Sequence, residues 1–109
     1  MKNLVQYITE KLKVNKDVNA IKDCYDAYEI LKKYFKEKIS NDNLYKITLR
    51  ESNNTDKKII VFEFKDKLSK TDWRSVITHI LDKNNIYNYS CGRCVRRING
   101  EQWHFTLQF

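Results

Sequence analysis

The 109-residue sequence contains no proline and only two glycines. In most proteins these two residues mark the ends of helices and strands, because proline stops helices and glycine forms tight turns. No Pro/Gly/Ser-rich linker, internal repeat or low-complexity segment interrupts the chain. We therefore predict a single domain whose elements end at polar clusters such as Ser40-Asn41-Asp42-Asn43.

Long hydrophobic runs are also missing, and no segment approaches the roughly 20 apolar residues of a membrane span. The N-terminus, MKNLVQYITEKLK, lacks the apolar core and small-residue cleavage site of a secretory signal. We accordingly expect a cytoplasmic protein with no transmembrane segment. The chain has three cysteines, Cys24, Cys91 and Cys94, which should be free thiols in that compartment.

What the chain does contain is enough apolar material for a core, at 41% hydrophobic and 13% aromatic residues. Its net charge is +7, from 21 Lys and Arg against 14 Asp and Glu. The positive excess is spread along the chain rather than gathered in a tail. Such a charge favours anionic partners, nucleic acid first.

The N-terminal third of the sequence has the periodicity of helices. Apolar residues recur at helical spacing at Leu4, Val5, Ile8 and Leu12. They predict a short amphipathic helix within residues 1–13, which would dock on the body or bind a partner. A polar stretch at 14–17 is expected to interrupt it, and a second helix should follow over about 18–38. Residues 17–109 would form a single α+β domain.

The rest of the chain predicts two hairpins with a helix between them: strands 45–50 and 58–65, a helix over 73–81, and strands 86–97 and 101–109. We expect Ser69 or Thr71 to cap that helix. The fold class is thus α+β in the order α-α-β-β-α-β-β. We predict a four-stranded, mainly antiparallel sheet with the helices packed on one face.

The segment YNYSCGRCVRRINGEQWHF, residues 87–105, concentrates most of the chemically distinctive side chains. Its Asn99-Gly100 pair predicts a two-residue turn. That turn would place Cys94 opposite Phe105 and would put Gly92 and Trp103 on the core face. The outer face would then collect Tyr87, Tyr89, Cys91, Arg93, Arg97, Gln102, His104, Thr106 and Gln108.

On this outer face we select five residues as contacts for nucleic acid or another partner: Tyr87, Tyr89, Arg93, Arg97 and His104. Arginines pair with phosphates and aromatic rings stack on bases, and sheet faces of this kind bind single strands. The alternative is a protein-interaction module, self-associating or inhibiting a host protein, that uses the N-terminal helix or an open sheet edge. A solvated sheet face without any ligand has the same residue types.

Other kinds of site find less support in the sequence. Cys91 and Cys94 have the spacing of half a zinc site, but there is no second cysteine pair, and on a regular strand the two would point to opposite faces. The two histidines, His79 and His104, belong to no catalytic motif. We predict a non-enzymatic protein with no metal, no cofactor and no small-molecule substrate.

The first 17 residues, MKNLVQYITEKLKVNKD, have a further feature. They resemble the short amphipathic leaders of small proteins of some tailed phages, in which Met-Lys-x-Leu opens a helix that ends in Leu-Lys-x-Asn. The match covers residues 1–17 only. The resemblance implies a small phage accessory protein that binds nucleic acid or a host protein, located in the host cytoplasm or associated with the virion.

Overall fold

The computed structural model describes residues 4–51 and 57–109, and it describes side chains from Ala20 onward. The elements are helix α1 (Leu4–Lys38), a short 3₁₀-helix (Asp42–Leu44), strands β1 (Tyr45–Glu51) and β2 (Lys58–Phe64), helix α2 (Trp73–Lys83), and strands β3 (Ser90–Arg96) and β4 (Gln102–Gln108). The strands form one antiparallel sheet in the order β1-β2-β4-β3. The predicted α+β class, with four antiparallel strands, is confirmed.

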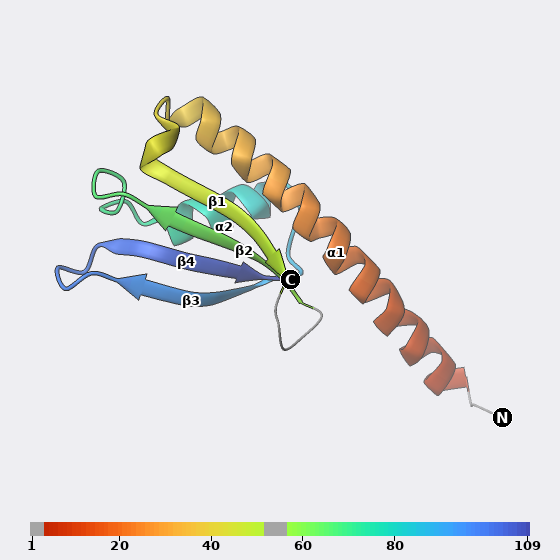
Figure 1. Ribbon diagram of the computed structural model, residues 1–109. Coiled ribbons are helices and arrows are strands. Elements are labelled where there is room, and N and C mark those ends of the chain that lie inside the picture. Colours follow the sequence, from red (N-terminus) through yellow and green to blue (C-terminus); the bar gives the residue numbers. More distant parts are fainter. Residues whose placement is uncertain (1–3, 52–56) are drawn as a thin grey trace.

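The core lies between the sheet and the two helices, which both pack on the same face (Figure 1). Its centre is aromatic. The ring of Phe35 in α1 lies 5.0 Å from that of Trp73 in α2 and 6.3 Å from that of Phe62 in β2. Phe62 stacks in turn on Phe105 of β4 at 4.8 Å. Burying each such side chain stabilises the fold by about 1.5–3 kcal/mol, so this cluster holds both helices on the sheet.

The N-terminal helix is continuous where the sequence predicted a break. α1 runs through residues 14–17, so the helix predicted within 1–13 and the one predicted at about 18–38 belong to one element. The stretch contains neither proline nor glycine, and Asn or Asp inside a helix costs less than about 1 kcal/mol relative to alanine. Nothing in it stops the helix. Residues 1–3 and the side chains of residues 4–19 lie outside the described part of the chain.

α1 docks on the sheet through its C-terminal half. Among the side chains described from Ala20 onward, those of α1 that are buried all lie on one helix face: Cys24, Ala27, Leu31 and Phe35. The N-terminal half extends beyond the ends of the strands, as Figure 1 shows in red to orange. A 35-residue helix is about 52 Å long at about 1.5 Å per residue. A seven-residue strand such as β1 spans only about 24 Å at about 3.4 Å per residue, so the helix is much longer than the sheet on which it packs.

The last hairpin turns with three residues rather than the predicted two. Arg97 N donates to Glu101 O at 2.9 Å, and Gly100 N donates to Arg97 O at 2.8 Å. The loop is therefore 98–100, and Gly100 supplies its left-handed conformation with a φ of +83°. The turn lies where the sequence predicted it, but its length differs by one residue.

An extra residue in β4 moves Trp103 out of the core. Val95 pairs with His104, and the next pair is Arg96 with Gln102. Trp103 is therefore left without a partner on β3. It is 40% exposed, whereas Gln102 is turned to the helix side and is 3% exposed. The prediction that Trp103 faces the core and Gln102 the outside is wrong, because a bulge reverses the alternation that the prediction assumed.

A second bulge lies in β3. Residues 92–93 together stand opposite Thr106. The flanking Cys91 and Cys94 consequently both pack against the core. Gly92 lies on the outer face instead, where an added Cβ would approach Thr106 Oγ1 to 2.3 Å. The predictions that Cys91 faces outward and Gly92 inward are therefore wrong, for the same physical reason as at Trp103.

Helix α2 begins at Asp72, whose carboxylate accepts hydrogen bonds from Ser75 N at 3.3 Å and Ser75 Oγ at 2.8 Å. Gln102 Oε1 reaches over from β4 and accepts the N–H of the first helical residue at 2.9 Å. Two of the N–H groups that a helix start leaves unpaired are thus satisfied. The predicted caps, Ser69 and Thr71, are wrong, and Ser69 is instead buried in the loop before the helix.

Candidate nucleic-acid interface

Among the described residues, both helices cover one face of the sheet, and we call the other the open face (Figure 1). Its side chains alternate with the core residues and form three rows across the strands: Lys46-Glu63-His104, Thr48-Val61-Thr106 and Arg50-Ile59-Gln108. The middle row is largely shielded from solvent, since the exposed fraction is 5% for Val61 and 7% for Thr106. Lys46 and Arg50 are exposed on β1, so the open face has a compact centre with cations beside it.

The end of the open face nearest the tip of the β3–β4 hairpin carries an aromatic pair. The ring centroids of Trp103 and His104 lie 5.6 Å apart, and Nδ1 of His104 is buried without a hydrogen-bond partner among the described residues. A cavity of about 530 Å³ opens beside Trp103. The charged side chains that line it are Asp42, Lys46, Glu63, Lys65 and Arg97. Aromatic surface and cationic groups therefore meet at this end of the sheet.

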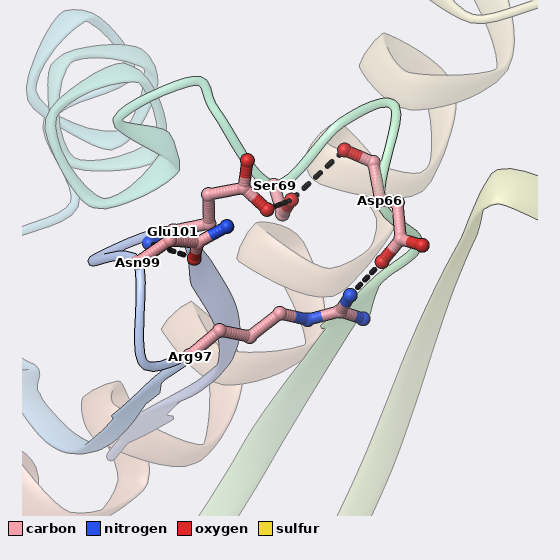
Figure 2. Close-up of polar contacts among 5 residues, drawn as sticks. All are labelled: Asp66, Ser69, Arg97, Asn99 and Glu101. Atoms are coloured by element: carbon pink, nitrogen blue, oxygen red, sulfur yellow. Dashed lines mark hydrogen bonds and ion pairs between the residues drawn. The ribbon is translucent and has the colours of Figure 1, made fainter.

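Polar contacts tie the hairpin tip to the loop between β2 and α2 (Figure 2). The hydroxyl of Ser69, a residue that is 1% exposed, is shared between Glu101 Oε2 at 3.0 Å and the carbonyl oxygen of Asp66 at 2.9 Å. The guanidinium of Arg97 forms an ion pair with the Asp66 carboxylate. Within the hairpin, Glu101 N donates to Asn99 Oδ1 at 3.2 Å. These contacts hold Arg97 at the rim of the cavity.

The structure brings together only part of the predicted contact set. Arg97 lines the cavity and His104 lies in the row beside it. Arg93 is exposed on β3 next to the middle row. Tyr87 and Tyr89 come before β3 begins, whereas Arg97 follows its end. The two tyrosines are therefore separated from Arg97 by the length of a strand.

Neither tyrosine extends the open face. Tyr87 is 61% exposed, and its hydroxyl donates to the carbonyl oxygen of Asp82 in α2 at 3.3 Å. Tyr89 packs against the core with its ring 5.7 Å from that of Phe109. Burial raises the pKa of the Tyr89 hydroxyl, as expected for a phenol on the helix side of the sheet.

The cysteines lie on the core side of the molecule. Cys91 and Cys94 share that side of β3, contrary to the prediction that they point apart, and Gln102 Nε2 donates to Cys94 Sγ at 3.6 Å. Cys24 is fully buried in α1, and burial raises the pKa of its thiol to about 11. Among the side chains that the structure describes, no three His, Cys, Asp or Glu residues gather closely enough to hold a metal ion.

Sequence analysis missed three residues that the structure places around the open face: Lys46, Arg50 and Trp103. The alternation in β1 shows that Lys46 and Arg50 share a face, but it does not show which strands are neighbours. Because β2 lies between β1 and β4, these cations share the face of His104. Nothing in the sequence indicates the bulge that exposes Trp103.

Searches of protein-family models, of curated proteins and of solved structures find no match for this chain. No helix within residues 4–51 and 57–109 has the length and apolar character needed to span a membrane.

Proposed function

We propose that this protein is a small non-enzymatic module that binds single-stranded nucleic acid across the open face. The observation that carries the proposal is the exposed indole of Trp103 on a sheet face flanked by Lys46 and Arg93. Single-strand-binding sheets combine base–aromatic stacking with cations that follow the phosphates. The net charge of +7 adds long-range attraction for a polyanion.

The cations on β1 are spaced for more than one phosphate. Lys46 and Arg50 are four residues apart on the same face, which corresponds to about 14 Å at about 3.4 Å per residue. The three rows of open-face side chains would accommodate a short segment of a nucleic-acid strand. Single-strand-binding modules have sites that begin at about 4 nucleotides, and we expect the open face to contact a segment of similar length.

Binding of labelled single-stranded DNA and RNA of about 12 nucleotides, measured by fluorescence anisotropy at low and high salt, tests the proposal. We expect binding that weakens steeply with salt, by about 0.7 in the logarithmic slope for each phosphate neutralised. Fluorescence of Trp103 should be quenched when a base stacks on it. Absence of binding at low salt would refute the proposal.

A pair of double variants separates a specific face from bulk charge. Lys46→Ala with Arg50→Ala removes two open-face cations, and Lys33→Ala with Lys36→Ala removes two exposed cations of α1 on the helix side. Both variants lower the net charge by two. We expect only the first to weaken binding strongly and to reduce the salt slope, because only that face contacts phosphate. Equal losses in both variants would point to nonspecific attraction.

A second candidate function, that of a protein-interaction module, is favoured by the overhang of α1. The N-terminal half of α1 extends beyond the sheet (Figure 1). A helix of half the length of α1 is only marginally stable by itself in water. A partner protein or a second copy of the chain would stabilise that segment. Such a partner would also fit the phage-type accessory role that residues 1–17 imply by resemblance.

A further inference from the structure

The cavity beside Trp103 is a hollow at one end of the open face. It lies where β1 begins and β2 ends, and its aromatic lining includes Tyr45 and Trp103. Its volume of about 530 Å³ falls within the roughly 300–1,000 Å³ of sites that enclose small organic groups. A single nucleotide is a group of that size.

Trp103 provides the surface on which a base can stack. The bulge leaves it without a partner on β3, and its side chain is 40% exposed. The neighbouring His104 ring, at 5.6 Å and tilted by 36°, stands beside the indole rather than stacked flat on it. The partly exposed indole lines the cavity. Stacking on such a ring tolerates any base, because every base has a π-face.

The charges around the cavity favour a ligand with few negative charges. Lys46 and Lys65 line it together with Arg97 and with the carboxylates of Asp42 and Glu63. A nucleotide within a strand carries one negative charge, whereas the several charges of a nucleoside triphosphate would be repelled by the two carboxylates. Because Arg97 is already paired with Asp66, the phosphate position falls to the two lysines.

We propose that the cavity holds one nucleotide of the bound strand, with its base on the Trp103 indole and its phosphodiester at Lys46 and Lys65. This inference rests on the proposed function and adds a position to it: one base is enclosed, and the rest of the strand follows the open face by its backbone. The affinity of the protein should consequently depend on the presence of bases and not only on phosphates.

The test uses the full chain and two labelled strands of about 12 nucleotides, oligo(dT) and an abasic strand of the same length. Trp103→Ala should weaken binding of oligo(dT) about tenfold or more and leave binding of the abasic strand unchanged, since only stacking is lost. Tyr87→Ala is the matched control, because it removes another exposed ring, 61% accessible, at the opposite end of the sheet. It should change neither affinity.

Two further variants keep the test decisive. Trp103→Phe retains an aromatic face and should recover most of the affinity for oligo(dT), which a misfolded variant would not. Lys46→Ala should weaken both strands and lower the salt slope by about 0.7. Thymidine monophosphate should compete far less well than unlabelled oligo(dT), because it cannot contact the remaining rows.

The inference is overturned if Trp103→Ala weakens both strands equally, if Tyr87→Ala causes the base-dependent loss instead, or if thymidine monophosphate competes as well as the strand. These outcomes all require that the wild-type protein binds oligo(dT). Failure of the wild-type protein to bind either strand at low salt is a separate result, and it refutes the proposed function itself.

Discussion

Trp73 and Trp103 are the two tryptophans of this chain, and they occupy opposite environments. Trp73 is 7% exposed, and its ring stacks on Phe64 at 5.3 Å. Trp103 is 40% exposed beside the cavity. Since fluorescence of an exposed indole responds to a bound base and that of a buried one does not, any quenching by the proposed ligand should come from Trp103.

Cys24 should resist alkylation in the folded protein, whereas Cys91 and Cys94, which are partly exposed, should react. The thiolate is the reactive form, and burial raises the pKa of the Cys24 thiol to about 11. Mass spectrometry after iodoacetamide treatment should therefore find Cys24 modified only in denaturant. Equal labelling of all three in native protein would show that α1 is not docked on the sheet.

The same shift predicts the direction of a pH effect. Because the pKa of Cys24 is raised in the folded state, the fold keeps its full stability below the pKa of the unfolded thiol and loses part of it as the pH rises toward about 11. A Cys24→Ala variant should lack this part of the alkaline loss in urea unfolding curves.

At the scale of elements, the start of α2 is held by two parts of the chain that are distant in sequence. Asp72 caps it locally, and Gln102 caps it from β4. The bulge at Trp103 is what turns Gln102 toward the helix. One irregularity in β4 therefore has two effects: it satisfies a buried helix start on one face and exposes an indole on the other.

Asp72→Ala should destabilise the protein by about 0.5–2 kcal/mol at neutral pH, because the cap is lost. Hydrogen bonds from Ser75 Oγ and Ser75 N hold the pKa of the Asp72 carboxyl below its usual range. Its contribution is thus present above the ordinary Asp pKa of about 3.9 and is lost as the pH falls through the lower folded-state value. Urea unfolding at about pH 7 and about pH 3 should show a smaller cost of the variant in acid.

Asp82→Ala is the control for this effect. Asp82 is an exposed carboxylate near the other end of the same helix, where a negative charge is unfavourable to the helix dipole. Its removal should leave stability unchanged or slightly increased. A cost as large as that of Asp72→Ala would mean that general charge, and not capping, accounts for the loss.

At the scale of the whole molecule, the protein is a single sheet with helices on one face and a long helix that overhangs it (Figure 1). The arrangement leaves two surfaces for partners, the open face and the N-terminal half of α1. The two proposed functions use these surfaces separately, so they can be tested independently.

Deleting residues 1–13 should leave the domain folded. The first buried side chain of α1 among the described residues is Cys24, so the deletion removes no described core contact. Urea unfolding should stay cooperative, with a midpoint close to that of the full chain. Phe35→Ala is the contrasting variant: it empties the centre of the core and should cost about 3–5 kcal/mol.

Sedimentation of the full chain and of the same deletion tests the second candidate function. If the N-terminal segment self-associates, the full chain should be an oligomer and the deletion variant a monomer. Binding of single-stranded nucleic acid by the open face should persist in both. An oligomer that survives the deletion would count against self-association through this segment.

The sequence by itself determined the fold class and the succession of the strands along the chain, although it divided α1 into two helices at 14–17. Helical spacing in α1 and α2, alternation in β1 and β2, and the Asn99-Gly100 turn signal each depend on local geometry, which neighbouring residues specify. The core positions Leu31, Phe35 and Phe105 follow from those periodicities as well. The basic and aromatic content that favours an anionic partner is likewise a property of the sequence.

Only the tertiary structure decided which side chains share a surface. The order β1-β2-β4-β3 places Lys46 beside His104, and pairing between strands distant in sequence leaves no local signal. The bulges at Trp103 and at 92–93 depend on how β4 packs between β2 and β3 while Gln102 reaches α2. A one-residue shift moves a side chain to the opposite face, which is why Arg93, Arg97 and His104 could be named from the sequence, while the exposure of Trp103 and the nearness of Lys46 could not.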